Sequence, residues 1–289
     1  MEWPGFYPVM ACAVDRIFAD GPDVRVVLYP DNPSLNAALR RKEVDLITGA
    51  ACDAFLLRSQ GTAARIIGIL DTSDGADVLL ARPGVTRLGQ TPDQRIACEG
   101  INSFSHLFVL DSLARAQVPE VAVHLHDISA AEVPQALLDG RLDVGHTWGP
   151  LADRAREQGC TVLVRAGDHP GVVTDVLMTR DDVIKLRHED VRRAVQGIYD
   201  RMAAYHDRET ELLSRVATFL NKPVGALSPV TGSVRLYRRD ESLAALRNRS
   251  IPLGIRARLD LQVDCLRRRG QFPAEFDAEA VFDPQFLAP

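Results

Sequence analysis

The sequence predicts an α/β protein built as two doubly wound lobes joined by a two-segment hinge, with a helical C-terminal tail packed on lobe one. Three observations carry this prediction. Strand-like apolar runs alternate with helical patterns as far as about residue 180. The alternation restarts near Ala76, and long amphipathic helices follow from Glu189 onwards. Strands that alternate with helices favour parallel sheets covered on both faces.

The expected elements of the first lobe begin with a helix at 8–19, because Pro8 suits a first helical turn and Gly21 with Pro22 ends the pattern. Strands are predicted at 24–29 (VRVVLY), 44–48 and 65–70, and helices at 32–41 and 51–59.

The second lobe repeats this order and is followed by the tail. Strands are predicted at 77–81, 95–98, 121–126, 142–147, 161–164 and 172–179, helices at 103–116, 131–138 and 151–158, and tail helices without further strands at 189–205, 208–220, 241–247 and 255–268. A helical tail has to pack on an existing lobe. Lobe one should therefore comprise 1–72 and 174–289, lobe two 73–173, and the two crossings form the hinge.

A weak internal echo marks equivalent turns in the two lobes. Asp45 and Asp143 each open a strand after a helix, and five residues further on lie Ala50 and Trp148. Turns at the carboxyl ends of strands form the ligand crevice in doubly wound sheets.

Composition excludes several classes of protein. The 289 residues carry a net charge of -5 with scattered basic residues, which argues against a nucleic-acid partner. No apolar run approaches the roughly 18 residues of a membrane span. The five cysteines form no C-x-x-C pair, so buried free thiols are expected rather than a zinc site. The first residues lack the pattern of a secretory signal, which leaves a trimmed leader or a cytoplasmic protein as alternatives.

Several segments in register resemble one known family. They are Trp3-Pro4-Gly5-Phe6-Tyr7-Pro8 ("W-x-G-Y-x-P"), Ser73-Asp74-Gly75-Ala76-Asp77 ("S-x-G-A-D"), Cys98-Glu99-Gly100 with Ser105-His106-Leu107-Phe108, Gly140-Arg141-Leu142-Asp143 with Thr147-Trp148-Gly149-Pro150, Val234-Arg235-Leu236-Tyr237, and the closing Phe282-Asp283-Pro284-Gln285-Phe286-Leu287. Over nearly the whole chain, the sequence resembles the nitrate/sulfonate/taurine group of ABC-transporter substrate-binding proteins, which includes binding proteins for thiamine-precursor pyrimidines. Gly149 replaces a usual Glu, and Asp74 a common Asn, which puts the identity of the ligand in doubt.

The resemblance implies a type II periplasmic binding protein. Such a receptor is a monomer that closes two lobes over a small molecule and presents it to an ABC permease, in the periplasm or outside the cell, without a cofactor. Two alternatives stay open. The same fold serves as a sensor input or adaptor, and it resembles a pyrimidine synthase of thiamine biosynthesis. That enzyme needs a Cys-rich iron-binding segment and a pocket Lys, which this sequence lacks.

The candidate ligand-binding residues lie at the turns and strand ends described above. They are Trp3, Phe6, Tyr7, Ala50, Ser73, Asp74, Gly75, Glu99, Asn102, Ser103, Trp148 and Asp175. Trp3 and Trp148 offer rings for stacking, and the helix after Ser103 offers free N–H groups. The alternatives are a packing role for Trp3, a plain hinge turn at 73–75, a helix cap at 102–103 and a solvated carboxylate at Glu99.

The charges of the expected crevice loops favour a cationic ligand. The loops contain no Lys and no Arg, but they contain Asp53, Asp71, Asp74, Glu99 and Asp175. A sulfonate or nitrate would depend on helix N-termini alone, whereas an amine, amidine or aminopyrimidine can pair with a carboxylate and stack on indole. Motifs for nucleophilic, phosphate-binding and metallopeptidase sites are absent, so the sequence predicts binding without catalysis.

Overall fold

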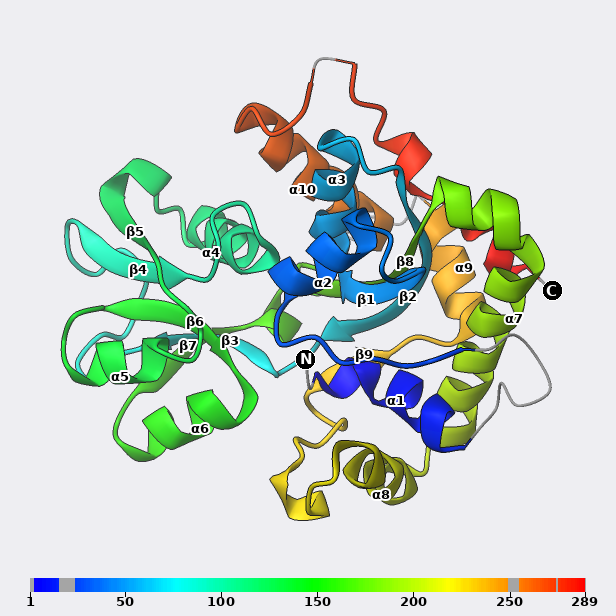
Figure 1. The fold of residues 1–289 in the computed structure, drawn as a ribbon. Coiled ribbons are helices and arrows are strands. Elements are labelled where there is room, and N and C mark those ends of the chain that lie inside the picture. The colour runs from blue at the N-terminus through cyan, green and yellow to red at the C-terminus, as the bar shows by residue number, and fades with distance from the viewer. Residues whose placement is uncertain (1–2, 16–23, 249–254, 274, 289) are drawn as a thin grey trace. The chain divides into compact units, whose positions relative to one another are not determined.

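The computed structural model describes residues 3–15, 24–248, 255–273 and 275–288 (Figure 1). The chain divides into two compact units: unit 1 is Met1–Thr72 with Thr174–Pro289, and unit 2 is Ser73–Val173. Each unit contains one sheet with helices packed on it, and the sheet of unit 2 is mixed. The α/β class predicted from the sequence is confirmed. Of the helices in the described ranges, none is long and apolar enough to cross a bilayer.

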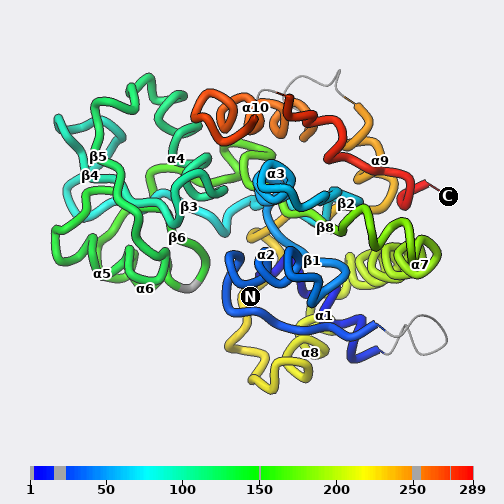
Figure 2. Tube along the Cα trace, turned by 45° about the horizontal axis from the view of Figure 1, so that its top comes forward, coloured from blue at the N-terminus to red at the C-terminus, as the bar shows by residue number. Residues whose placement is uncertain are grey.

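Unit 1 contains a four-stranded sheet in the order β1-β8-β2-β9. Its strands are β1 (Leu46–Ala50), β2 (Ala64–Ser73), β8 (Thr174–Arg180) and β9 (Val234–Leu236), and its helices are α1 (Tyr7–Val14), α2 (Asn32–Arg40), α3 (Ala51–Ser59), α7 (Asp181–Tyr205), α8 (Glu209–Leu220), α9 (Arg239–Arg247) and α10 (Ile255–Arg268). Short 3-10 helices span Pro4–Phe6, Val224–Ala226, Glu279–Val281 and Pro284–Leu287. Figures 1 and 2 both show α1 and α8 side by side.

Unit 2 contains a five-stranded sheet in the order β5-β4-β6-β3-β7. Its elements are β3 (Asp77–Ala81), β4 (Gln94–Cys98), α4 (Phe104–Arg115), a 3-10 turn at Glu120–Ala122, β5 (Val123–Asp127), α5 (Val133–Leu138), β6 (Val144–Trp148), α6 (Gly149–Glu157), β7 (Thr161–Arg165) and a 3-10 turn at Ala166–Asp168. Alternate residues of β3 serve opposite faces: Leu79 packs in the core beneath α4, and Val78 and Leu80 pack in the core beneath α5 and α6 (Figure 1).

The expectation of parallel sheets is wrong for one strand in each unit. β8 runs antiparallel to both of its neighbours, β1 and β2, and β3 runs antiparallel to β6 and β7. A parallel neighbour requires a crossover connection, usually a helix. β3 and β8 are the first strands after each passage of the chain from one unit to the other, and no crossover helix precedes either strand.

Two further predictions of elements are corrected. Residues 24–29 are extended but form no strand, because no neighbouring strand in the described ranges pairs with them. The tail, expected to be purely helical, contributes β9 to the sheet, and the Tyr237 N–H donates to the Leu70 carbonyl at 2.9 Å. The predicted helix at 8–19 is seen as α1 to Val14, and its last residues lie outside the described ranges.

A buried carboxylate joins three segments of unit 2. Asp143 accepts hydrogen bonds from Arg82 Nε at 2.8 Å, from Arg95 Nε and Nη2 at 3.0 Å, and from the Arg95 backbone N–H at 2.9 Å. These bonds, with Arg95 as the main cause, hold the pKa of Asp143 well below its usual range. The contribution to stability is therefore present above about pH 4 and is lost as the pH falls through the folded-state pKa.

Replacing Asp143 with Asn should lower the free energy of unfolding of unit 2 by about 1–2 kcal/mol at pH 7, because the two half-exposed arginines lose a charged acceptor. Urea unfolding followed by Trp148 fluorescence, in a Trp3→Phe background, measures this change. Asp153→Asn is the matched control, because its ion pair with Arg156 is exposed and should be worth less than about 0.5 kcal/mol. Equal effects of the two substitutions would contradict the role given to Asp143.

Candidate functional site

Two carboxylates lie side by side at one end of the unit 1 sheet. Asp175 at the start of β8 is paired with Ala50, the last residue of β1, and with Asp71 of β2. Ala50 also caps the N-terminus of α3, with extended backbone angles. Asp71 and Asp175 are both buried. Because directly paired residues of neighbouring strands point to the same face, the two side chains share one patch of unit 1.

The predicted residue Trp3 belongs to the same patch. Its indole N–H donates to Asp71 Oδ1 at 3.0 Å, and the side chain is only 7% exposed. Trp3 is therefore buried although it lies near the N-terminus, and this burial agrees with the alternative of a packing role. Phe6 and Tyr7 are also buried. Contact of either side chain with a ligand stays a prediction.

Gly5 explains the glycine of the opening motif. A Cβ atom added to Gly5 would lie 1.8 Å from Asp71 Oδ2, which is far inside van der Waals contact. The Trp3–Asp71 hydrogen bond therefore requires a residue without a side chain two positions after the tryptophan.

Asp53, in the first turn of α3, is a third buried acidic residue of unit 1. Burial raises its pKa to about 6, although a hydrogen bond from Asn36 lowers the pKa in part. Its Oδ2 atom has no hydrogen-bond partner among the described residues. The pKa of the neighbouring Cys52 thiol is raised well above its usual value, first by burial and then by the charges of Asp53 and Asp175. Cys52 directly precedes Asp53 in the first turn of α3.

In unit 2, Trp148 occupies the position that corresponds to Ala50. It ends β6, caps the N-terminus of α6 and is half-buried. Its ring lies against the imidazole of His146, with the ring centroids 5.8 Å apart. Phe104 and Phe108 approach the same imidazole edge to face, at 5.6 and 5.7 Å. Trp148 therefore packs on an imidazole that is itself in contact with two phenylalanine rings.

His146 is fully buried and is held by one carboxylate. Its Nε2 atom lies 2.8 Å from Asp77 Oδ1, and Asp77 is also buried. The sequence reasoning did not select His146 or Asp77. The available signal was spacing, because His146 precedes Trp148 by two residues on a strand and must share its face.

The loop before α4 uses most of its polar groups internally. Ser103 is the N-cap, and its Oγ accepts a hydrogen bond from the His106 backbone N–H. The Asn102 N–H donates to His106 Nδ1 at 2.9 Å, and the Glu99 N–H donates to Ser105 Oγ at 2.9 Å. The alternative of a helix cap at 102–103 is therefore present in the structure, and ligand contacts of Glu99 and Asn102 stay predictions.

The crossover turn 73–75 is also tied within unit 2. Ser73 donates its N–H to the Val173 carbonyl at 3.1 Å, and its Oγ accepts from the Asp77 N–H at 3.0 Å. Asp74 is exposed, and its carbonyl would lie 2.1 Å from a Cβ added to Gly167. Gly75 is half-exposed. Ser73 thus stabilises the turn through its hydrogen bonds, whereas Asp74 and Gly75 are accessible to solvent.

Arg235 and Tyr237 are the residues that the sequence reasoning missed in unit 1. The unexpected strand β9 brings them to the end of β2, where Tyr237 and Thr72 form a side-chain hydrogen bond. Burial raises the pKa of Tyr237, and the charge of Asp71 raises it further. The Arg235 guanidinium lies 4.7 Å from the centre of the Tyr237 ring. A cation is therefore present near the end of β2, outside the loops in which none was found. Arg235 also forms an ion pair with Glu241 at 3.0 Å.

The described ranges contain no group of three or more His, Cys, Asp or Glu side chains that could hold a metal ion. None of the five cysteines forms a disulfide bond.

Comparisons with known proteins identify the fold. No protein-family profile and no curated protein sequence matches the chain. Among solved structures, the periplasmic aliphatic sulphonate binding protein SsuA from Escherichia coli matches with a TM-score of 0.74 and 13% identity, covering 96% of this chain and 89% of that chain. The alkanesulfonate-binding protein SsuA from Xanthomonas axonopodis pv. citri, bound to MOPS, has a TM-score of 0.73 and 14% identity over 97% and 96% of the two chains.

An enzyme has a similar fold. The desulfurization enzyme DSZB matches with a TM-score of 0.63 and 16% identity, covering 97% of this chain and 94% of that chain. At these identities the comparisons show the fold, which is that of the periplasmic binding proteins, and they agree with the resemblance to ABC substrate-binding proteins carried by the sequence motifs.

Replacing Gly5 with Ala should lower the melting temperature by several degrees, because the new methyl group forces Asp71 away from Trp3. Gly225→Ala is the control, since an added Cβ there meets no atom within 4 Å. Differential scanning calorimetry checks both. In an Asp71→Ala background the Gly5→Ala penalty should largely vanish, and a full penalty in that background would refute the proposed clash.

Proposed function

We propose that this protein is a solute-binding receptor for an ABC importer and that it binds a small organic molecule without converting it. The observation that carries the proposal is the equivalent placement of Ala50 and Trp148, each of which ends a strand and caps the following helix. In doubly wound folds this edge of the sheet is where ligands bind. Around these two positions lie stacking rings and carboxylates, which suit recognition of a small solute.

The two units are proposed to be the lobes that close over the solute, residues 1–72 with 174–289 and residues 73–173. The closed form would be presented by a monomer to its permease, in the periplasm or outside the cell. If the protein were instead a sensor or adaptor, the liganded form would not stimulate ATP hydrolysis by its cognate transporter in proteoliposomes. Stimulation of ATP hydrolysis by the liganded form would support the role of a transport receptor.

The buried carboxylates favour a ligand with an amino or amidine group, for example an aminopyrimidine. Asp53, Asp71 and Asp175 are buried in unit 1, and Asp71 accepts a hydrogen bond from the neutral N–H of Trp3. A ligand cation would offset the cost of burying these charges.

A sulfonate is the second candidate ligand. Two of the similar structures are sulfonate-binding proteins by their descriptions, and Arg235 lies near the end of β2. The pairing of Arg235 with Glu241 weakens this argument, because the guanidinium is already partly neutralised.

The thiol of Cys52 does not support a catalytic role for the site. Burial raises the pKa of the Cys52 thiol, which directly precedes Asp53, well above its usual value, so the thiol stays protonated near neutral pH. The thiolate is the nucleophilic form of cysteine. Binding without turnover is therefore favoured over an enzymatic role.

Replacing Trp148 with Ala should weaken ligand binding by about 1–3 kcal/mol, because it removes an aromatic wall held in place by His146. Isothermal titration calorimetry measures the change with any solute identified by thermal-shift screening. Trp148→Phe is the control and should retain most of the affinity. Unchanged affinity of the Ala variant would remove Trp148 from the binding site.

Replacing Glu99 with Gln distinguishes the two classes of ligand. For an amine or amidine, the loss of a charge-assisted hydrogen bond should cost on the order of 1.5–3 kcal/mol of binding free energy. For a sulfonate, affinity should stay equal or improve, because a like charge is removed. Calorimetry with both ligand classes gives the sign, and tighter sulfonate binding combined with no response to amines would refute the cationic ligand.

A further inference from the structure

Two buried oxygen atoms of unit 1 face one small space beside Gly49 and have no hydrogen-bond donor among the described residues. They are Asp53 Oδ2, in the first turn of α3, and Asn32 Oδ1, in the first residue of α2. A buried acceptor without a donor costs free energy, and native proteins contain few such atoms. We call the space that these two acceptors share the Gly49 notch.

Gly49 of β1 sets the size of the notch. A Cβ atom added to this residue would lie 3.7 Å from Asp53 Oδ2 and 3.9 Å from Asn32 Oδ1, so both acceptors lie within 4 Å of one point. The atom nearest to the same point is Met178 Cε, at 3.2 Å. Methionine is an unbranched and flexible side chain, so the notch widens when this side chain turns away.

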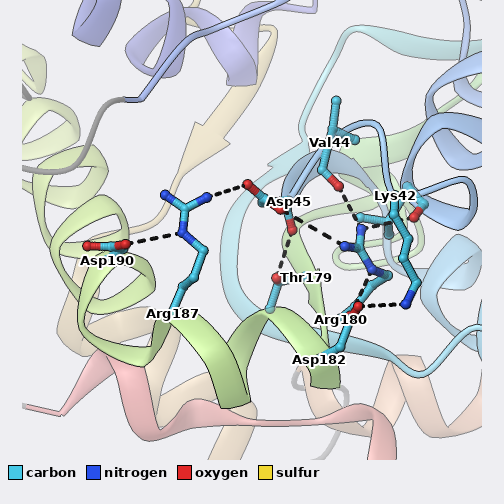
Figure 3. Close-up of polar contacts among 9 residues, drawn as sticks. Lys42, Val44, Asp45, Thr179, Arg180, Asp182, Arg187 and Asp190 are labelled. Atoms are coloured by element: carbon cyan, nitrogen blue, oxygen red, sulfur yellow. Dashed lines mark hydrogen bonds and ion pairs between the residues drawn. The ribbon is translucent and has the colours of Figure 1, made fainter.

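Other carboxylates of unit 1 have cationic partners. Asp182 pairs with the buried Arg180 at 2.9 Å, and Asp45 pairs with Arg187 at 2.8 Å (Figure 3). Both of these carboxylates are partly exposed to water, which makes an ion pair less necessary. Asp53 is only 8% exposed, and it forms no ion pair with any residue in the described ranges.

The surroundings of Asp53 favour a positive charge in the notch. Its carboxyl group accepts a hydrogen bond from the uncharged side-chain amide of Asn36, and burial is the main cause of its raised pKa. Asp175 is a second buried carboxylate, and in the sheet it pairs with Ala50, the residue that follows Gly49. Two carboxyl groups close to one turn favour an incoming cation and disfavour an incoming anion.

The two acceptors select one kind of ligand group. Both require N–H or O–H donors, and a carboxylate binds a charged donor more strongly than a neutral one. A primary ammonium or an amidinium carries at least two N–H bonds in one small group, whereas a sulfonate carries only acceptor oxygens. We propose that Asn32 and Asp53 form a subsite that binds the cationic nitrogen group of the solute in front of Gly49. This subsite rests on the receptor function proposed above.

The first test compares three ring compounds of similar size, namely benzamidine, benzamide and benzenesulfonate. Benzamidine is the cationic donor, benzamide has nearly the same shape without the charge, and benzenesulfonate is the anion. Calorimetric titration at millimolar ligand should show that benzamidine binds at least ~10-fold more tightly than benzamide, with no binding of benzenesulfonate to this subsite. Failure of benzamidine to bind better than benzamide would overturn the subsite.

The second test fills the notch and leaves both acceptors in place. Gly49 has no left-handed backbone conformation, and the nearest atom belongs to the flexible end of Met178. Gly49→Ala should therefore keep the melting temperature within about 2 °C of the wild type but weaken benzamidine binding by ~10-fold or more, because the methyl group occupies the position of the ligand nitrogen. An unchanged benzamidine affinity in this variant would place the ligand elsewhere.

The third test removes the charge of Asp53 and keeps its shape. Asp53→Asn should weaken benzamidine binding by ~10-fold or more and should not lower the melting temperature, because no ion pair is lost. Asp182→Asn is the matched control, since it removes a carboxylate that has a cationic partner and should leave benzamidine affinity unchanged. A lower melting temperature of Asp53→Asn with unchanged affinity would show that the residue has only a structural role.

The orientation of the Asn32 amide has its own test. If the amide nitrogen faced Asp53, the two side chains would satisfy each other, and Asn32→Ala should then lower the melting temperature without a change in benzamidine affinity. That result would also overturn the subsite. The receptor function is tested separately: a solute that stimulates ATP hydrolysis by the transporter and binds Asp53→Asn as tightly as the wild type would refute the subsite alone. Benzamidine binding that depends on Asp53, without stimulation by any bound solute, would refute the receptor alone.

Discussion

The pairing of β2 with β8 is the contact on which the rest of unit 1 depends. The two strands are separated in sequence by the whole of unit 2, and β8 lies between β1 and β2 in the sheet. Closing a loop of this length costs entropy that local contacts do not repay until the sheet forms. Unit 2 has its own two cores on the faces of a five-stranded sheet, so it can form within the loop and bring the ends of β2 and β8 together. This same pairing sets Asp71 beside Asp175.

The patch of carboxylates at the end of the unit 1 sheet and the fold are therefore built from the same residues. Asp71 pairs with Asp175 in the sheet, accepts the indole N–H of Trp3 and excludes a side chain at Gly5. A substitution at Asp71 would alter stability, which is why the positions chosen for binding measurements are Trp148 and Glu99. Both lie in unit 2, and neither is a fully buried side chain.

The local elements could be predicted from the sequence wherever periodicity and caps agreed. α3, β3 and α10 begin and end where apolar spacing and turn residues place them. The direction of β3 and β8 could not be predicted, because direction depends on pairing between distant segments rather than on composition. Residues 24–29 illustrate the same limit: VRVVLY has the composition of a strand, but a strand exists only where a neighbour provides its hydrogen bonds.

The residues of the candidate site could be predicted from the sequence only where they belong to local features of the chain. Motif residues at strand ends, such as Ala50 and Trp148, were accessible to sequence reasoning because the turn after a strand is a local feature. Arg235 was not, since only the pairing of β9 brings it to the end of β2. Its pairing with Glu241 matters more than its presence, because a guanidinium shared with a carboxylate offers little net charge to an anion.

Among the charged groups described at the strand ends of unit 1, the carboxyl groups of Asp53, Asp71 and Asp175 are buried, and the guanidinium of Arg235 is already paired with Glu241. Buried carboxyl groups are costly unless each finds donors or gives up its charge, and burial raises the pKa of Asp53 for this reason. For the proposed receptor, a solute with a positive charge would lower this cost on binding, and an anionic solute would increase it. Similar folds bind sulfonates in other proteins, so the decision belongs to the side chains at the strand ends and not to the fold.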